Sequence, residues 1–492
     1  MATESKLLAA ILAHPDEDTP RLALADFLDE QGAPEQRDRA EFIRLQIADE
    51  NGGDLPRPPD TSLRTAELLI AHRAAWTPPI PDDFKCHDFH RGFVERVSCD
   101  TLRFLEFGED VCSLAPVRRV HFHGPPDSLA AVGGSPLLGR VRSLSVGEMK
   151  PTLAQLLHFL GSPHVRDLFE FVSYLNDHDD AAVAALAKCE KLAGLTHLDL
   201  WGNGQITAAG ATTVATAPHF RSLRQLKLPS TEIGDAGLAA VASGLPELTT
   251  LAAWRCGIGP KGVAALARSK MAPRLRSLSL GGNPIGGEGV AALARGAFRD
   301  LHDLSISDGG VGPDVAAVLA GSPALAGLRA LDIEENPLGP GGGAALFGGG
   351  AFPRLWDLNA DDCGIGDAGA AAFAAGDGDE LRWLSLCDCD IGDKGAIALA
   401  NSPRLKNLVH LNLYGNRIGD KGAIALANSP YLANVEWVHL RNNRIGEKGA
   451  QALAESATFS PGDTLWLHGN KVRRAAQREL EARFPGRLDF TS

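Results

Sequence analysis

The segment Ile391–Pro403 reads Ile-Gly-Asp-Lys-Gly-Ala-Ile-Ala-Leu-Ala-Asn-Ser-Pro, and the same thirteen residues return at Ile418–Pro430. The 27-residue step between the two copies can be followed through most of the 492-residue chain. Each step reads L-x-x-L-x-L-x-x-N-x-I-G-x-x-G-x-x-A-L-A. Self-similarity at such a period indicates a solenoid, in which some positions build the stack and others remain available to bind.

The first half of each step has the pattern of a strand. Leu411 and Leu413 alternate with His410 and Asn412, so the leucines can point inward and the polar residues outward. Stacked steps then form one parallel sheet, predicted from about Val94 to Leu467.

The second half of each step has the pattern of a helix. Gly392 permits a bend, Asp393 can cap the helix, and the apolar residues Ala396, Leu399 and Ala400 recur at helical spacing. We therefore expect one helix per step, packed closely against the sheet because its inner face is mostly alanine.

The frame can be numbered from the first apolar residue of each step, which we call position 1. Ten steps start at Leu195, Leu223, Leu248, Leu275, Leu301, Leu328, Leu355, Leu381, Leu408 and Val435, with a partial step at Leu465–Val472. Four degenerate steps precede them, starting at Val94, Val117, Val141 and Val165.

Position 9 carries Asn or Cys in nine of eleven steps. The residues are Asn203, Asn283, Asn336, Asn416, Asn443, Asn470, Cys256, Cys363 and Cys389, with Thr231 and Gly309 as exceptions. A side chain here lies inside the bend after the strand, where an amide can pair backbone groups of adjacent steps. An Asn-or-Cys ladder at this offset is a strong signal of the repeat class.

On these residues the chain resembles the leucine-rich repeat family, and within it the ribonuclease-inhibitor-like subclass, over residues 93–472. The resemblance implies an α/β horseshoe with a parallel concave sheet, convex helices and a macromolecule bound on the concave face. The N-terminal run Leu7–Gln46 resembles a short repeat-companion module of planctomycete repeat proteins, which suggests a bacterial protein and implies no activity.

The residues on either side of the repeat array follow other sequence patterns. Apolar stripes predict three short helices in residues 1–50, a small all-α module. Residues 51–92 read as a linker and N-terminal cap, with a helix at Ser62–Trp76 and a break at Pro78–Asp83 before the first strand. Residues 473–492 read as a C-terminal capping helix and tail, because a terminal repeat cannot bury its outer face alone.

Composition limits the function classes. The formal charge of −13 makes nucleic acid an improbable general partner and argues against an anionic membrane. Leu7–Ala13 is too short for a signal peptide and no apolar run is long enough to span a bilayer, so we expect a cytoplasmic protein, monomeric in isolation. Eight cysteines lack a disulfide framework, although Cys363 and Cys389 occupy equivalent places on adjacent steps within reach of a bond.

The sequence predicts no enzyme, metal or cofactor. Cys86, His87 and His90, with Cys99, match no standard zinc spacing, and the two histidines are expected in a loop. Strand positions differ from step to step, so no nucleophile, base and orienter can be assigned. Gly-rich stretches coincide with bends and do not resemble phosphate loops.

Outward strand positions hold six of the seven tryptophans: Trp201, Trp254, Trp356, Trp383, Trp437 and Trp466, with Tyr414 beside them. Exposed tryptophan is typical of binding hot spots, although such rings can also pack on their neighbours across a sheet. Trp383, His410 and Trp437 share one column on three consecutive steps. We interpret this face as a partner site.

Charge varies along the same face. Eight carboxylates fall on four consecutive steps: Asp308, Asp332, Glu334, Glu335, Asp357, Asp361, Asp362 and Asp388. The early steps carry the opposite sign, with Arg96, Arg118, Arg119, His121, His123, Arg142 and Arg166. Crowded acids favour a cationic partner, and the alternative is a hydrated acidic surface.

The favoured function is a non-enzymatic scaffold that binds a protein or peptide with basic and apolar groups on the concave face. A second reading is a regulatory protein, since the resemblance extends to GTPase-activating proteins of the Ran type. A third is nucleic-acid recognition through the basic early steps. Stimulated GTP hydrolysis would favour the second reading, and salt-dependent retention on nucleic acid the third.

Overall fold

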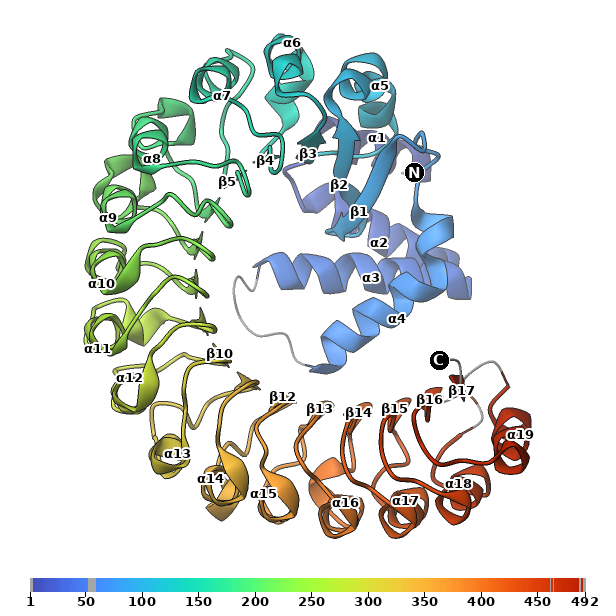
Figure 1. Cartoon of the computed structure of the whole chain (residues 1–492). Coiled ribbons are helices and arrows are strands. Elements are labelled where there is room, and N and C mark those ends of the chain that lie inside the picture. The colour runs from blue at the N-terminus through green and yellow to red at the C-terminus, as the bar shows by residue number, and fades with distance from the viewer. Residues whose placement is uncertain (1–2, 52–58, 461, 463, 486–487, 490–492) are drawn as a thin grey trace. The chain divides into compact units, whose positions relative to one another are not determined.

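The computed structural model describes residues 3–51, 59–460, 462, 464–485 and 488–489. The chain divides into two compact units, Met1–Ile233 with Glu247–Thr250 and Gly234–Pro246 with Leu251–Ser492. Each unit stacks one short strand and one helix per step, with the helices on one side of the strands (Figure 1). The predicted fold class, a leucine-rich-repeat-like α/β solenoid with an all-α N-terminal region, is confirmed.

The strands are short and almost all parallel. The first unit contains β1 Phe84–His90, β2 Phe93–Asp100, β3 Arg119–His123, β4 Ser143–Ser145, β5 Glu170–Val172, β6 His197–Asp199 and β7 Gln225–Lys227. The second contains β9 Ser277–Ser279, β10 Asp303–Ser305, β11 Ala330–Asp332, β12 Asp357–Asn359, β13 Trp383–Ser385, β14 His410–Asn412, β15 Trp437–His439, β16 Thr464–Trp466 and β17 Leu488–Asp489, and β8 Thr250–Ala252 straddles the unit boundary. Neighbouring strands pair in register, so equal positions of successive steps lie side by side.

The helices follow the strands in the chain. The first unit holds α1 Glu4–Ala13, α2 Thr19–Gln31, α3 Pro34–Asn51, α4 Pro59–Trp76, α5 Thr101–Leu114, α6 Leu129–Gly133, α7 Leu153–Leu160, α8 Asp180–Leu186 and α9 Ala208–Thr216. The second holds α10 Gly234–Gly244, α11 Pro260–Ala267, α12 Gly286–Ala294, α13 Pro313–Ala320, α14 Gly339–Phe347, α15 Gly366–Ala374, α16 Asp393–Ala400, α17 Asp420–Ala427, α18 Glu447–Ala454 and α19 Arg474–Arg483. Short 3-10 turns lie at Pro126–Ser128, Pro136–Arg140, Glu190–Leu192, Pro218–Phe220, Ala272–Arg274, Gly348–Gly350 and Pro403–Leu405.

The position-9 ladder performs the predicted task. Asn416 is 4% exposed, and its Oδ1 accepts the backbone N–H groups of Cys389 and Ile391 at 3.2 and 2.9 Å. Its Nδ2 donates to the carbonyls of Leu386 and Leu413 at 2.7 and 3.1 Å. One side chain thus pairs backbone groups in two successive steps.

The recurring Asp at the start of each helix was predicted to cap that helix, and the structure gives it another partner. Asp393 does not cap its own helix; its Oδ1 accepts the N–H groups of Gly419 and Gly422, at the start of α17 in the next step, both at 2.8 Å. Gly422 has no room for a side chain, because a Cβ there would lie 2.7 Å from Ile418 and 3.0 Å from that carboxylate. The repeated Gly-Asp-x-Gly segment therefore joins successive steps, whereas the sequence suggested a local cap.

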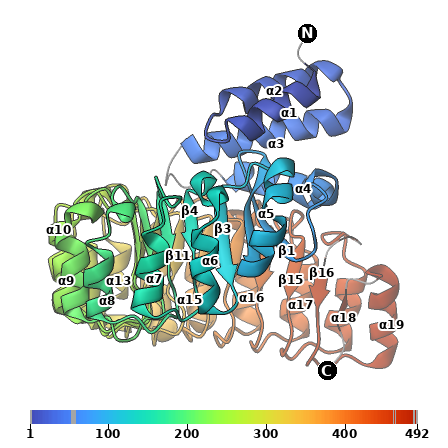
Figure 2. The same cartoon turned by 90° about the horizontal axis from the view of Figure 1, so that it is seen from above.

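The three predicted helices of the N-terminal region are present as α1, α2 and α3 (Figure 2). They share a core that includes Ile11, Leu24, Leu28 and Ile43, and it extends to Phe93 on β2. The module therefore packs against the first strand pair of its own unit. The predicted linker falls mostly outside the described residues, and the proposed domain boundaries stay predictions.

A buried ion network reinforces this contact. Arg21, fully buried on α2, lies 2.7 Å from Glu95 on β2, and Arg91 lies 2.9 Å from the same carboxylate and 3.2 Å from Asp18. Burial raises the pKa of Glu95 and lowers that of Arg21 to about 10, and the opposite charges counter both shifts. Buried charges of this kind are costly unless they are paired, which ties the helices to one docking position.

Two sequence predictions in the early steps are wrong. His90 lies on β1, which pairs antiparallel with β2, where the sequence predicted a loop. The fourth step does not start at Val165: β5 pairs in register with β4 and β6, which makes Leu168 position 1 and Asn176 position 9. Asn176 accepts the N–H of Lys150 and donates to the carbonyl of Val146, as a ladder residue does.

Candidate partner-binding face

Positions 3, 5, 7 and 8 of each step lie on the side of the strands away from the helices, which we call the strand face. The strand residues between them, such as Leu384, Leu411 and Val438, are buried. Trp383, His410 and Trp437 pair in register at position 3 of β13, β14 and β15, as the sequence predicted.

These three rings form a stack. The Trp383 and His410 ring centroids are 4.1 Å apart at an interplanar angle of 21°, and His410 and Trp437 are 5.7 Å apart at 17°. Burial between the indoles lowers the pKa of His410, which favours its neutral form. Trp383 and Trp437 remain 45% and 37% exposed. The stack thus presents two rigid apolar surfaces.

The other predicted aromatic residues are less accessible. Trp466 packs 5.3 Å from Trp437, and Tyr414 lies 5.4 Å from His439, which extends the stack across β14–β16. Trp201, Trp254 and Trp356 are also only partly exposed. Packing of such rings on their neighbours across the sheet, the alternative given by the sequence, thus accounts for part of this aromatic set.

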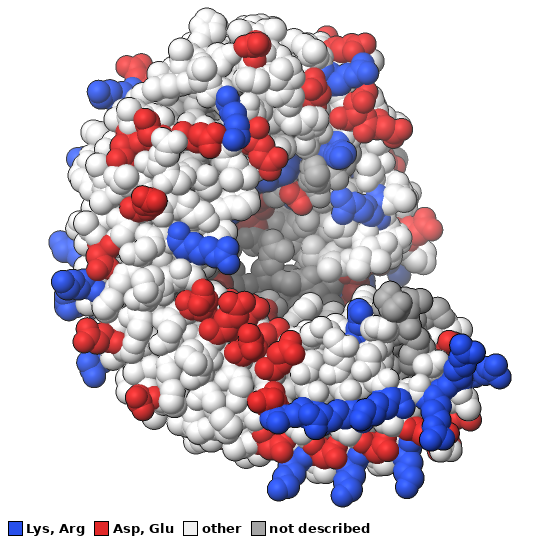
Figure 3. Space-filling model, viewed as in Figure 1, with Lys and Arg blue, Asp and Glu red and all other residues white. Residues whose placement is uncertain are grey.

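Position 8 carries the most accessible acids. Asp308, Glu335, Asp362 and Asp388 follow β10–β13, and all four are exposed. Each has a positive φ between 45° and 56°, a left-handed conformation that Asp tolerates better than most residues and Glu does not. Figure 3 shows acidic side chains gathered on this part of the molecule.

Three of the predicted acids accept hydrogen bonds from neighbouring residues. Asp361 accepts the hydroxyl of Ser385 at 2.7 Å and the backbone N–H of Cys387 at 2.6 Å. Asp332 accepts the Ser305 hydroxyl at 2.8 Å. Glu334 accepts the Asn359 amide, and burial, followed by nearby carboxylates, raises its pKa. These three acids therefore also contribute hydrogen bonds to the fold.

A groove of about 420 Å³ lies between the acids and the ring stack. Its lining includes Asp303, Asp332, Asp357 and Trp383, and Asp357 pairs in register with Trp383. Burial raises the pKa of Asp303 to about 6, and the positive charge of Arg329 partly counters this rise. Burial also raises the pKa of Asp357 to about 6, and the neighbouring carboxylates of Asp332 and Asp303 raise it further. None of these three acids forms an ion pair with a residue that the structure describes.

Asp303 was missed in the sequence. It occupies position 3 of its step, three steps before Trp383 in the same column, and column membership was the signal that could have found it. A neighbouring groove of about 470 Å³ brings Trp254 and Arg255 together with Asp308, Glu334 and Glu335. Both grooves belong to the second unit.

The basic early steps are largely neutralised within the first unit. Arg118 forms an ion pair with Asp16, Arg142 lies 3.8 Å from the same residue, and Arg119 lies 3.0 Å from Glu50. Arg96 contacts Asp88 and Glu170, each at 3.4 Å. In the corrected frame Arg166 lies two residues before position 1 of its step, outside the positions that form the strand face. These pairings weaken the nucleic-acid reading.

The remaining His and Cys residues that the sequence analysis considered for metal binding or a disulfide serve neither purpose in the part of the chain that the structure describes. His90 lies 2.9 Å from Glu50, while the side chains of Cys86 and His87 fall outside the described residues. No described group of three or more His, Cys, Asp or Glu side chains could hold a metal ion. Cys363 and Cys389 are thiols, each 3.0 Å from a backbone carbonyl of the preceding step, and burial raises their pKa to about 12 and about 11.

Comparison with known families agrees with the repeat frame. A family model described as Leucine Rich repeat matches residues 273–294, 381–400, 404–427 and 433–454. The chain contains leucine-rich repeats. These matches cover the steps with the ring stack, and the acidic steps between residues 301 and 380 continue the same leucine-rich frame. No curated protein gives a significant match.

Comparison with solved structures gives matches of low identity. An internalin from Listeria monocytogenes is 18% identical over 75% of this chain and 94% of that chain, with a TM-score of 0.41. The Rad7 and Elc1 complex of yeast gives 16% identity over 76% and 93%, with a TM-score of 0.40. At these values the similarity concerns the fold alone. Within the described residues, no helix has the length and apolar character needed to cross a membrane.

Proposed function

We propose that the protein is a non-enzymatic scaffold whose second unit binds a protein or peptide segment that carries basic and apolar groups. Leucine-rich repeats commonly mediate protein–protein interaction, which supports this class of function. The observation that carries the proposal is the groove in which Asp303, Asp332 and Asp357 adjoin Trp383 and form no ion pair with a described residue.

Charge supports a basic partner. Carboxylates that share a groove repel one another, and burial raises the pKa of two of them because the charged form is poorly solvated. An arginine or lysine side chain in the groove would stabilise the ionised forms. The exposed position-8 acids beside the groove would attract such a partner from solution and orient it.

The ring stack supports an apolar or flat contact. Trp383 and Trp437 offer exposed aromatic faces held in place by His410, so little conformational entropy is lost when a partner covers them. A guanidinium over a tryptophan face contributes about 0.5–1 kcal/mol at an exposed site. Arginine fits both the groove and the stack, because it pairs with carboxylates and stacks on rings.

Three acetylated, amidated peptides test the proposal. (Arg-Leu)3 carries both groups, (Glu-Leu)3 reverses the charge, and (Arg-Ser)3 removes the apolar side chains. We expect the first to bind most tightly to the full chain. Trp383→Ala should weaken that binding by about 2 kcal/mol, roughly thirty-fold, mainly through faster dissociation.

The triple variant Glu335→Gln, Asp362→Asn and Asp388→Asn should slow association and flatten its salt dependence. A matched control removes three exposed acids from the helix side of the same unit: Glu288→Gln, Asp314→Asn and Glu455→Gln. Equal binding of (Arg-Leu)3 and (Glu-Leu)3, or the same loss of association rate in both triple variants, would refute a specific acidic site.

Three finer assignments are also proposals. One strand and one helix per step support the ribonuclease-inhibitor-like subclass, and the helices α1–α3 support the resemblance to the companion module. The seven described cysteines are all thiols, which supports a reducing, cytoplasmic location. Whether the isolated protein is monomeric is open to direct measurement by sedimentation.

A further inference from the structure

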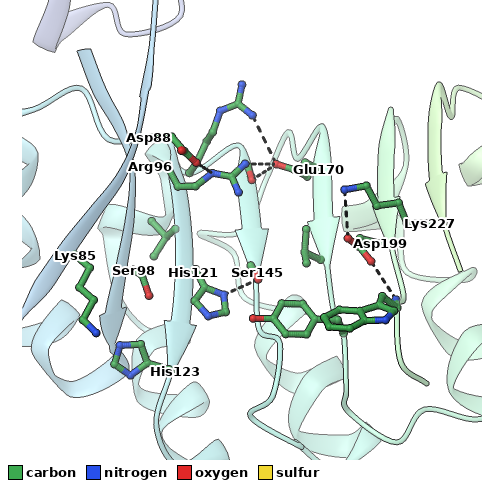
Figure 4. Close-up of a pocket in the computed structure, with 16 residues that line it drawn as sticks. Lys85, Asp88, Arg96, Ser98, His121, His123, Ser145, Glu170, Asp199 and Lys227 are labelled. Carbon is green, nitrogen blue, oxygen red and sulfur yellow. Dashed lines mark hydrogen bonds and ion pairs between the residues drawn. The ribbon is translucent and has the colours of Figure 1, made fainter. Parts of the chain in front are cut away.

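The first unit contains a separate hollow of about 630 Å³ on its strand face. Side chains from β1 to β7 line it, and Figure 4 shows their arrangement. The residues that matter for the argument are Lys85, Ser98, His121, His123, Tyr174 and Trp201. Trp201 was predicted as a contact for a protein partner, and His121 and His123 belonged to the nucleic-acid reading. The hollow lies outside the groove and ring stack of the proposed function.

The part of the hollow around Glu170 is neutralised by its own side chains. Arg96 and Arg119 lie 3.4 and 3.7 Å from the Glu170 carboxylate, and the hydroxyl of Ser143 donates to it. Burial raises the pKa of Glu170, but the hydroxyl and the two arginines outweigh it and the net shift is downward. This carboxylate stays ionised and paired, so a ligand gains little here.

The two other acids of the lining also have partners. Asp88 lies 3.4 Å from Arg96, and Asp199 lies 3.7 Å from Lys227 and accepts the backbone N–H of Trp201. Every acidic side chain of the lining thus forms an ion pair with an Arg or Lys of the same lining.

Lys85 provides a positive charge that no described acid pairs with, and the exposed imidazole of His123 provides a further polar group. Lys85 is exposed and forms no ion pair with a described acid, and Ser98 pairs with it in register from β2. His123 follows on β3, with its ring 6.5 Å from that of His121. In Figure 4 the three labelled side chains Lys85, Ser98 and His123 lie at the same end of the hollow. An ammonium, a hydroxyl and an imidazole together can donate to oxygen atoms of an anion.

Next to this end the hollow has an aromatic wall. The Tyr174 ring is nearly parallel to His121, 6.0 Å away at 7°, and Trp201 continues the wall 5.5 Å from Tyr174. The hydrogen bond from His121 to Ser145, at 2.7 Å, fixes the imidazole. A flat apolar group has a fixed surface to lie on, with donors at one end of it.

We propose that this hollow binds a single oxyanion, a carboxylate or a phosphate, that is attached to an aromatic or similarly flat group. The oxyanion lies against Lys85, Ser98 and His123, and the flat group lies on Tyr174 and Trp201. A nucleic-acid strand does not fit this arrangement, because its next phosphates would meet Asp88, Glu170 and Asp199 and find no unmatched cation in the lining besides Lys85.

Small probes test the site on the full chain by calorimetry. Phenyl phosphate and phenylacetate carry both features, inorganic phosphate lacks the ring, and benzyl alcohol lacks the charge. We expect the first two to bind with a Kd on the order of 1 mM and the last two at least about ten-fold more weakly. Binding of only one of the two charged aromatic probes would assign the site to a phosphate or to a carboxylate.

Lys85→Gln and His123→Gln should each weaken the charged aromatic probes about five-fold, the size of a partly exposed charge contact. Tyr174→Leu should weaken them while leaving the weak binding of inorganic phosphate unchanged. Lys188→Gln, an exposed lysine of the same unit outside the hollow, is the matched control. Unchanged melting temperatures verify that each variant is folded.

Equal affinity for benzyl alcohol and phenyl phosphate would overturn the proposal, as would wild-type affinity in the Lys85→Gln, His123→Gln double variant. The probes contain no basic group, so Trp383→Ala should bind them like the wild type. If the small probes do not bind as expected, the proposed function of the second unit is unaffected. If the peptides do not bind as expected, the proposal for the hollow is unaffected.

Discussion

Replacing Asn416 with alanine tests how the stack of repeats is held together. The amide accepts hydrogen bonds from two buried backbone N–H groups, of Cys389 and Ile391, and donates to three carbonyls, of Leu386, Leu413 and Tyr414. Alanine leaves these groups without a partner, and its smaller volume admits no side-chain substitute. An unpaired buried polar group costs about 1–3 kcal/mol, and the two N–H groups dominate because a carbonyl is more often left partly unsatisfied.

We therefore expect Asn416→Ala to lower the free energy of unfolding by about 2–4 kcal/mol, less where water enters the bend. Because a long repeat array can unfold in parts, amide hydrogen exchange at Cys389 and Ile391 is the decisive measurement, supported by the melting temperature. Exchange at these two amides should accelerate more than at amides of distant steps.

Two variants serve as controls. Asn412→Ala removes a partly exposed amide whose hydrogen bonds, to the Ser385 hydroxyl at 3.1 Å and from the Tyr414 N–H at 3.3 Å, lie on the strand face, so its cost should stay below about 1 kcal/mol. Asn416→Cys should cost less than alanine, because Cys389 donates to a carbonyl and lies against backbone N–H groups in the neighbouring step. Equal exchange and melting in Asn416→Ala and Asn412→Ala would refute the ladder.

Two further predictions concern carboxylates. Asp393→Ala should destabilise the chain by about 1–3 kcal/mol, because the Gly419 and Gly422 N–H groups lose a charged acceptor, whereas its exposed neighbour Lys394→Ala should change the melting temperature little. Equal melting of these two variants would contradict the inter-step role. Raised pKa values near 6 for Asp303 and Asp357, against a usual 3.8, mean that the folded chain holds more protons than the unfolded chain between these values. Their stabilising contribution is present below about pH 4 and is lost as pH rises through about 6. The double variant Asp303→Asn, Asp357→Asn should therefore flatten this part of the pH profile of the free energy of unfolding in urea. An unchanged profile would show that these two carboxyls do not titrate as inferred.

The sequence by itself determined the period, the strand and helix in each step, the position-9 ladder and the Trp383–His410–Trp437 column. These follow from local rules: alternation with period two, helical spacing of small apolar residues, and identical chemistry at equal offsets. Once the frame is fixed, strand pairing in register places equal positions side by side, so residues 27 apart can be assigned as neighbours from the sequence alone.

Only the tertiary structure decided what depends on partners far apart in the chain or on a broken frame. In the degenerate steps the apolar pattern admitted Val165 as a start, and strand pairing selected Leu168. The repeat frame showed that Asp393 recurs. From the sequence, its carboxylate could accept hydrogen bonds from its own helix or from the helix of the next step, and only the packing of the steps assigns it to Gly419 and Gly422.

The charges of the early steps show the same limit. Arg118 and Arg119 read as a basic surface until α1–α3 place Asp16 and Glu50 against them, from residues about a hundred and about seventy positions away. Ion pairing, burial and the hollow at Lys85 depend on where separate elements dock. That docking follows from the burial of whole apolar faces, which no local pattern specifies.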